Sequence, residues 1–421
     1  MQPQLNLGLY LQRFGTVILT AILLAGCSDD TAKPQSGVTI KESNPGVFEL
    51  LNPQLSEFTK EISLDYVRQI GIDFKKVAIE IEKLQSSMVM LINQTNSKNL
   101  SLSRQAWQGA HSAYELTTLH RYFATQLLDE HNNLALTQLQ YQINHWPIVP
   151  GYIDYVDGYP DSGIIFDINV NLETGSLRVQ HGFFDESEVT LGFHVIEFLL
   201  WGLRTDLDTR SANDYRGIKE LSPEEIEQGY TLKQLSHNRR RLFLTRVTDI
   251  LVEDFRALQT LWIAQAPSIR QRVESASGPQ LIVILADSMS AMLREELLLR
   301  SLYPMLNGDF VGSIQSPYSR STQNAVSSQL SGLERLLLER PAENGTTLDL
   351  VFSAISDEFS EFFYQNFDAS KSCLVLLYDK RASNSVGPTN QRETETEIVE
   401  CINLLNNIIH SNDRLKFDLA N

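Results

Sequence analysis

The residues best suited to chemistry lie in the segment Gly192-Phe193-His194-Val195-Ile196-Glu197. If this segment is helical, His194 and Glu197 are three residues apart and share one face. An imidazole and a carboxylate placed together can bind a divalent or ferric ion, and di-iron bundles use the reversed Glu-x-x-His spacing in the same way. Gly192 has no side chain, so another backbone or a ligand can approach it. The same spacing is also typical of a hydrogen-bonded His–Glu pair in a helical core, and two ligands alone do not complete a metal site.

Three further candidates lie on the helical segment before residue 128. Trp107 and Tyr114 are seven residues apart, a spacing typical of core aromatics. Arg121 can either anchor a carboxylate ligand or pair with Glu197. The histidines His111, His120 and His131 have spacings that place them on different faces, so they are weak candidates for a shared site.

Other polar candidates lie farther along the chain. Tyr152 and Asp154 fall in a segment rich in Gly, Pro, Asp and Tyr, where ionisable and phenolic groups often serve function. Ser319 can line the site or only cap the helix that follows it. Glu295 and Glu296 fit a solvated helix face.

The cysteines indicate export. Leu24-Ala25-Gly26-Cys27 follows Arg13 and a short apolar run, which is typical of a lipoprotein signal peptide whose cysteine sulfur receives diacylglycerol. The residue after Cys27 is serine, which favours the outer membrane by the enteric sorting rule. We therefore predict a signal peptide over 1–27 and a flexible tether over 28–46. Cys373 and Cys401 can form a disulfide, because the compartment outside the cytoplasm is oxidising.

The elements that must position these residues are predicted to be helices, because apolar residues recur at three- and four-residue spacing nearly throughout. The helix of the His–Glu pair is predicted over 186–201, with Asp185 as its cap, Glu188 as the capping-box partner and Gly202 as its end. A long irregular insert over 146–184 precedes it, and such inserts in helical chains usually cover or form a site. The other predicted helices cover 55–94, 101–128, 134–145, 222–262 with a break near Gly229, 281–302, 323–340, 348–367 and 394–409.

Composition and length restrict the class of protein. The 421 residues include 52 acidic against 35 basic ones, a net charge of −17, which argues against a nucleic-acid partner. No Gly-rich phosphate loop, nucleophile elbow, CxxC or HExxH occurs. The number of long helices suits two packed bundles, one over 47–215 and one over 216–421.

The motifs, taken together, resemble the imelysin family. That family carries a GxHxxE motif, often extended as GxHxIEFLLWG, and here residues 192–202 read GFHVIEFLLWG. Further similarities, in the same order as in the family, are Ala106-Trp107 with Tyr114 and Arg121-Tyr122, then Trp146-Pro147, the segment 152–156 (YIDYV), residues 163–165 (GII) and the serine segment 316–321. The match spans about residues 100–340. Family members often have Glu where this chain has Thr118, so a carboxylate is missing from that helix.

The resemblance implies an all-α protein of two packed helical bundles, with a site near GxHxxE to which Trp107, Tyr114, Arg121, Tyr152, Asp154, Gly192 and Ser319 contribute. Members are exported, often lipid-anchored and associated with iron acquisition, and the family is also catalogued as a metallopeptidase group. A zinc peptidase needs three protein ligands, a water and a general base, whereas HxxE provides two groups and residue 198 is Phe rather than a second His.

We therefore rank binding above hydrolysis. The expected function is that of a periplasm-facing lipoprotein, held in the outer membrane through Cys27, which binds a metal or metal-bearing ligand through His194 and Glu197 in iron uptake. Iron is the expected metal and zinc the alternative, with other envelope iron-uptake proteins as partners. The runner-up is a metal-dependent peptidase. The third alternative is a structural or adaptor lipoprotein in which the His–Glu pair only stabilises the core.

Overall fold

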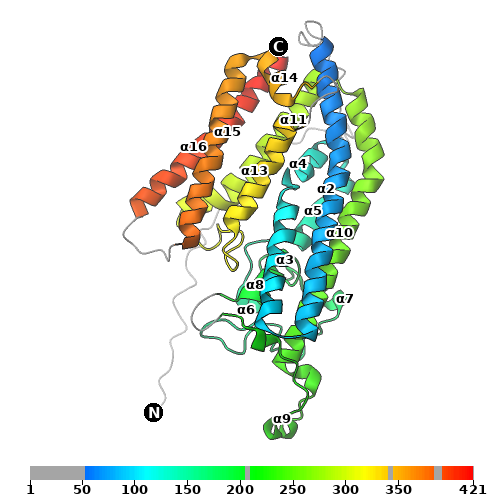
Figure 1. The fold of residues 1–421 in the computed structure, drawn as a ribbon, viewed down its shortest axis with the longest axis vertical. Coiled ribbons are helices and arrows are strands. Elements are labelled where there is room, and N and C mark those ends of the chain that lie inside the picture. Colours follow the sequence, from blue (N-terminus) through cyan, green and yellow to red (C-terminus); the bar gives the residue numbers. More distant parts are fainter. Residues whose placement is uncertain (1–52, 204–208, 340–344, 384–390, 421) are drawn as a thin grey trace, which may run out of the picture. The chain divides into compact units, whose positions relative to one another are not determined.

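The computed structural model describes residues 53–203, 209–339, 345–383 and 391–420. Within these ranges the chain forms helices and no strand, which confirms the predicted all-α class (Figure 1). No described helix is long and apolar enough to cross a membrane. The predicted signal peptide, the lipobox residue Cys27 and the tether 28–46 lie outside the described residues.

Two long helices, α2 (Pro53–Asn93) and α10 (Ser236–Ser275), run side by side, and α3 (Ser97–Glu115) packs on α2 (Figure 1). The residues that α2 buries recur at three- and four-residue spacing, as in an amphipathic core helix; they include Ile62, Tyr66, Ile70, Phe74, Val77, Ile81 and Leu84. Because α10 follows the predicted boundary at residues 215/216 and α2 precedes it, the two predicted halves are packed directly together. The division into 47–215 and 216–421 stays a prediction.

The helix predicted over 101–128 is broken in the structure. It forms α3 and α4 (Thr118–Leu127), separated at Leu116 and Thr117. The hydroxyl of Thr117 donates to the carbonyl of Tyr114 and that of Thr118 to the carbonyl of Glu115, and such local bonds compete with the helical ladder. Another helix also crosses here, since a Cβ on Gly332 would lie 2.3 Å from the carbonyl oxygen of Leu116.

The C-terminal half begins with α11 (Gly278–Met292), which packs on α2 and α4. It continues as a π-helical segment, η3 (Leu293–Leu302), and the short α12 (Tyr303–Leu306). The helix thus runs through Pro304 instead of ending before it. π-Helical turns often occur at functional sites, and η3 carries two of the charged residues of the cavity described below.

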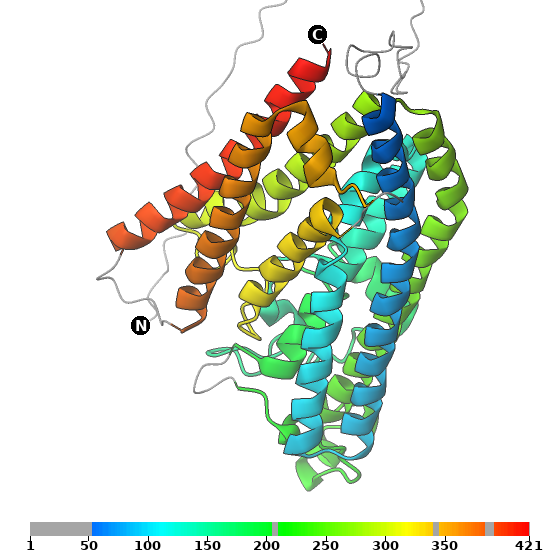
Figure 2. The same ribbon diagram turned by 45° about the horizontal axis from the view of Figure 1, so that its top comes forward.

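An irregular loop, residues 307–321, leads into α13 (Thr322–Leu338). The chain ends with α14 (Leu348–Ile355), α15 (Asp357–Ser383) and α16 (Gln391–Ala420). Helices α15 and α16 lie side by side (Figure 2). A disulfide joins Cys373 of α15 to Cys401 of α16, which confirms the predicted pair.

The insert over 146–184 is irregular, as predicted, and contains the short helices α6 (Pro150–Ile153) and α7 (Thr174–Gln180). Arg239 of α10 holds it in place: its guanidinium donates to the backbone carbonyls of four insert residues at 2.7–2.9 Å, namely Ile164, Ile165, Asp167 and Val170. Beyond the insert, η1 (Ala212–Tyr215), α9 (Pro223–Glu227) and η2 (Leu232–Gln234) lead to α10. Helix α9 has the predicted capping box, and a break follows near Gly229.

The helix of the GxHxxE motif is α8 (Phe193–Trp201), which is preceded by α5 (Glu130–Asn144). The predicted start at Asp185 was wrong, because Asp185 instead accepts a turn hydrogen bond from the backbone N–H of Ser187. Helix α8 begins after Gly192, whose φ of 93° and ψ of −178° suit only glycine. A Cβ on Gly192 would lie 2.7 Å from the carbonyl oxygens of Gln142 and Ile143. The packing of Gly192 on α5 therefore sets the helix start, and Gly202 ends the helix as predicted.

Candidate functional site

His194 and Glu197 lie together on α8, as their spacing predicts. Nδ1 of His194 is 2.9 Å from Oε2 of Glu197. Both side chains are buried, with 1% of His194 and none of Glu197 exposed. Nε2 of His194 is also buried and has no hydrogen-bond partner within the described ranges. The arrangement therefore leaves one imidazole nitrogen for a group that the protein does not supply.

The other oxygen of Glu197 is held by the loop 307–321. The backbone N–H and the hydroxyl of Ser319 both donate to Oε1 of Glu197 at 2.7 Å. Burial raises the pKa of Glu197 to about 7, although the bonds from Ser319 oppose the rise. Burial also lowers the pKa of His194 well below its usual value, aided by His111 and Arg300. His194 is therefore neutral at pH 7, and with Glu197 ionised its Nδ1–H donates to the carboxylate.

The N-terminus of α8 is fixed by an aromatic neighbour. The indole N–H of Trp107 donates to the carbonyl of Phe193 at 2.8 Å. The same indole stacks on His111, with ring centroids 4.8 Å apart. Trp107 is fully buried and thus serves as core support for the motif.

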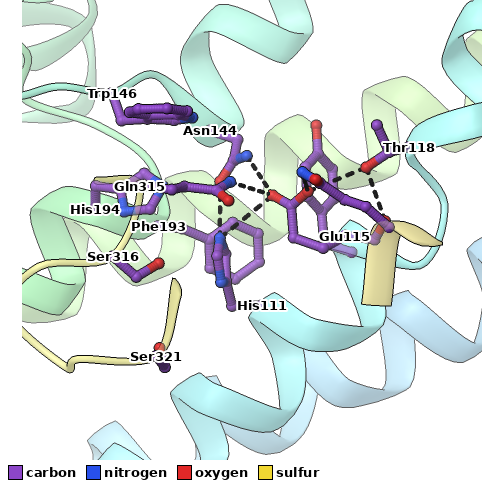
Figure 3. Close-up of polar contacts among 12 residues, drawn as sticks. His111, Glu115, Thr118, Asn144, Trp146, Phe193, His194, Gln315, Ser316 and Ser321 are labelled. Atoms are coloured by element: carbon purple, nitrogen blue, oxygen red, sulfur yellow. Dashed lines mark hydrogen bonds and ion pairs between the residues drawn. The ribbon is translucent and has the colours of Figure 1, made fainter. Parts of the chain in front are cut away.

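A second buried carboxylate, Glu115 of α3, lies near His111 and His194 (Figure 3). Three amide side chains donate to it at 2.6–2.7 Å: Asn144, Gln315 and Gln329. The hydroxyl of Thr118 adds a bond of 3.0 Å, and Nε2 of His111 lies 3.4 Å away. Burial raises the pKa of Glu115, but these donors and the charges of His111 and Arg121 outweigh it and hold the pKa below its usual range.

The sequence reasoning missed the Glu115 cluster. His111 and Glu115 are four residues apart on one helix, so their spacing gave the same one-face signal as His194 and Glu197. The amides come from α5, the loop 307–321 and α13, and no local pattern connects these segments with α3. Thr118, where the family often has Glu, donates to Glu115 and accepts from Arg121 at 3.1 Å.

A cavity of about 700 Å³ lies next to these residues. Tyr114 and Arg121 line it from α3 and α4, while Glu296 and Arg300 line it from η3. Glu296 is only 11% exposed and pairs with Arg300 at 3.1 Å, so its predicted place on a solvated face was wrong. Arg300 also lowers the pKa of His194, so a charge in the cavity wall acts on the motif.

Two predicted site residues lie elsewhere. Asp154 is fully buried and forms an ion pair with Arg240 at 2.6 Å and another with Arg210 at 3.3 Å. This pairing ties the insert to α10. The hydroxyl of Tyr152 donates to the carbonyl of Gln180 at 3.4 Å within the insert. Neither residue lines the cavity.

The donor set bears directly on metal binding. No group of three or more His, Cys, Asp or Glu side chains suited to a metal ion occurs among the described residues. Both oxygens of Glu197 accept protein hydrogen bonds, whereas Nε2 of His194 is free of them. An imidazole whose Nδ1–H donates to a carboxylate is the usual form of a ligating histidine. These residues fit a metal that brings further ligands with it and do not fit a cage made by the protein alone.

The comparisons with known proteins agree on the fold. The family model described as Imelysin matches residues 73–408. An iron-regulated protein A precursor from Parabacteroides distasonis superposes with a TM-score of 0.58 at 13% identity, over 86% of this chain and 95% of that chain. An imelysin-like protein from Psychrobacter arcticum superposes with a TM-score of 0.54 at 13% identity, over 84% and 92% of the two chains. The comparison with curated proteins gives no match.

Proposed function

Because this chain belongs to the imelysin family, we propose that it is an envelope lipoprotein of iron uptake that binds a metal-bearing ligand at His194. The observation that carries the proposal is the buried, unpartnered Nε2 of His194. Glu197 orients the imidazole as a positioning residue, since its own oxygens are engaged by His194 and Ser319. The iron-regulated description of the Parabacteroides distasonis protein supports iron as the metal.

The test is calorimetric titration of the purified protein with ferric citrate and, separately, with zinc chloride. His194→Ala removes the free nitrogen and should weaken binding at least tenfold. A matched control is His131→Ala, because His131 is an exposed histidine of α5. The control should bind as the wild type does. Equal binding by wild type and His194→Ala would contradict the proposal.

Glu197→Gln tests the positioning role. The backbone N–H of Ser319 can only donate, so the amide oxygen of Gln must face Ser319 and its NH₂ must face Nδ1 of His194. Nδ1 then accepts, the proton moves to Nε2, and Nε2 loses the lone pair that a metal needs. We expect a 10- to 100-fold loss of metal affinity with the fold retained by circular dichroism. Unchanged metal affinity of the variant would show that Glu197 does not position His194 for binding.

A structural role for the pair is the second candidate function, favoured by the burial of both side chains. In that case His194→Ala and Glu197→Gln lower the melting temperature while both titrations match the wild type. Thermal melts recorded beside the titrations separate the two functions.

The envelope location rests on Leu24-Ala25-Gly26-Cys27 and on the serine that follows. Labelling cells with radioactive palmitate and fractionating their membranes tests it. Cys27→Ser should abolish the label and leave an uncleaved precursor. Unchanged labelling of the variant would refute lipidation, and label in the inner membrane alone would refute the outer-membrane location.

A further inference from the structure

Arg121 is a buried charge without an ion-pair partner. Its side chain is 4% exposed and lines the cavity. Two of its five N–H groups donate to the hydroxyls of Thr117 and Thr118, at 3.4 and 3.1 Å. Across the described part of the chain, no carboxylate lies within ion-pair distance of it, so the predicted alternative of a pair with Glu197 does not occur. A guanidinium whose hydrogen bonds go only to hydroxyls can still bind a carboxylate through its other N–H groups.

None of the acidic residues that line the cavity forms an ion pair with Arg121. Glu296 accepts from the hydroxyl of Tyr122 at 2.9 Å and pairs with Arg300. Asp185 accepts from the N–H and hydroxyl of Ser187. Glu186 and Asp309, the remaining carboxylates of the lining, are solvent-exposed. No carboxylate of the lining therefore bonds directly to Arg121, and Glu115 and Glu296 act on its charge only through space.

Further unused donors lie beside Arg121. The hydroxyl of Tyr114 and the indole N–H of Trp146 are buried, line the cavity and have no partner in the described structure. The guanidinium carbon of Arg121 lies 4.4 Å from the centroid of the Tyr114 ring. Burial raises the pKa of Tyr114 to about 12, so the hydroxyl keeps its proton and can donate. An indole N–H can only donate.

We propose that this cavity is a binding site for a small organic polycarboxylate, with one carboxylate held by Arg121 and Tyr114. A guanidinium and a hydroxyl together suit a carboxylate, because Arg presents two parallel N–H groups. Tyr114, Tyr141 and Trp146 line the cavity, so aromatic side chains can contact the carbon skeleton of an organic anion. A volume of about 700 Å³ is in the usual range for such a ligand.

This inference extends the proposed function: the polycarboxylate can arrive free, or as the chelator that carries a metal to His194. Only the second form rests on the proposed function. Arg121 and Arg300 line the cavity, so a metal can enter beside them as an anionic chelate.

The test is calorimetric titration of the protein with sodium citrate in chelator-treated, metal-free buffer. Wild type should bind citrate, and Arg121→Gln should weaken binding at least tenfold. Tyr114→Phe removes only the hydroxyl and should weaken binding two- to tenfold, and it keeps the test valid if Arg121→Gln fails to fold. Arg256→Gln is the matched control, because Arg256 is an exposed, ion-paired arginine of α10; it should bind citrate as the wild type does.

The inference fails if wild type does not bind citrate, or if neither variant differs from it. Binding of sodium phosphate but not of citrate would overturn the organic class of the ligand. A parallel titration with ferric citrate separates the two forms. If His194→Ala loses the added affinity for ferric citrate but keeps that for citrate, the chelate form holds. If citrate binds and ferric citrate adds nothing in wild type, the proposed function fails while the anion site stands. If zinc binds through His194 but citrate does not bind, the proposed function stands while the anion site fails.

Discussion

His111 and His194 pack edge to face, with ring centroids 5.1 Å apart, and each lies against its own buried carboxylate. His111 is 3.4 Å from Glu115, and His194 is 2.9 Å from Glu197. Both carboxylates are fully buried, yet the pKa of Glu115 is lowered and the pKa of Glu197 is raised to about 7. The difference lies in the neighbouring groups, because His111, the charge of Arg121 and the amide of Gln329 lower the pKa of Glu115. Glu115 is thus a fixed anion of the core, while Glu197 can exchange a proton near neutral pH.

Glu115→Gln should therefore destabilise the protein more than Glu197→Gln does. The new amide would turn its NH₂ toward other donors, which leaves buried polar groups unsatisfied at a cost of about 2–4 kcal/mol. Burial already raises the pKa of Glu197 to about 7, so loss of its charge in Glu197→Gln should cost about 1 kcal/mol or less. Urea unfolding of both variants at pH 7 measures the difference. Equal midpoints would contradict the distinction between the two carboxylates.

The sequence predicted what local spacing determines. The one-face placement of His194 and Glu197 and the helix end at Gly202 were right, because helix geometry fixes them. The predicted start of α8 at Asp185 was wrong. The helix starts where Gly192 contacts α5, and the capping pattern at Asp185 does not indicate that contact. Asp154 forms an ion pair with Arg240, 86 residues away in the chain, which local spacing cannot predict. Its place among the site residues stays a prediction.

The donors around the two buried carboxylates could not be predicted from local spacing, because they come from distant segments of the chain. Gln315, Gln329 and Ser319 reach α3 and α8 from segments more than 100 residues away. Their amide and hydroxyl groups are ordinary polar residues in the sequence. Only the packing of the C-terminal half on α3 and α8 turns them into donors for two buried carboxylates.

Gly192→Ala should be strongly destabilising. The backbone there has a φ that alanine rarely adopts, and the added methyl would lie 2.7 Å from the carbonyls of Gln142 and Ile143. Strain and overpacking together should cost about 2–5 kcal/mol. Gly175→Ala is the matched control, because Gly175 is in helix α7 with open space around it, and it should be neutral or stabilising by up to about 1 kcal/mol. Similar unfolding midpoints for the two variants would show that the start of α8 tolerates a side chain.

Reduction of the Cys373–Cys401 disulfide should lower the stability of the α15–α16 pair. The bridge joins residues 28 apart, and the chain-entropy model gives about 3–4 kcal/mol for a loop of that length. Thermal melts with and without dithiothreitol measure the loss. The double variant Cys373→Ser/Cys401→Ser is the control and should melt near the reduced protein, without a response to dithiothreitol. A reductant-insensitive wild type with both thiols free would reject the disulfide.

Acid should destabilise the fold partly through His181, a histidine whose two nitrogens are both in use. Its Nδ1 accepts from the backbone N–H of Thr190, and its Nε2 donates to the carbonyl of Tyr141. Burial lowers the pKa of His181 from 6.5 to about 4. The unfolded chain therefore takes up a proton as pH falls below about 6.5, whereas the folded chain resists protonation until about pH 4, so stability falls across this window.

The expected loss from His181 between pH 7 and pH 5 is on the order of 1–2 kcal/mol. His181→Gln can keep one hydrogen bond and does not titrate, so it should be less stable than wild type at pH 7 but should lose less stability on acidification. His131→Gln, at an exposed position, is the control and should follow the wild-type slope. Urea unfolding at half-unit steps from pH 7 to pH 4.5 gives the slopes. Parallel curves for His181→Gln and wild type would show that His181 takes up its proton equally in the folded and unfolded chain.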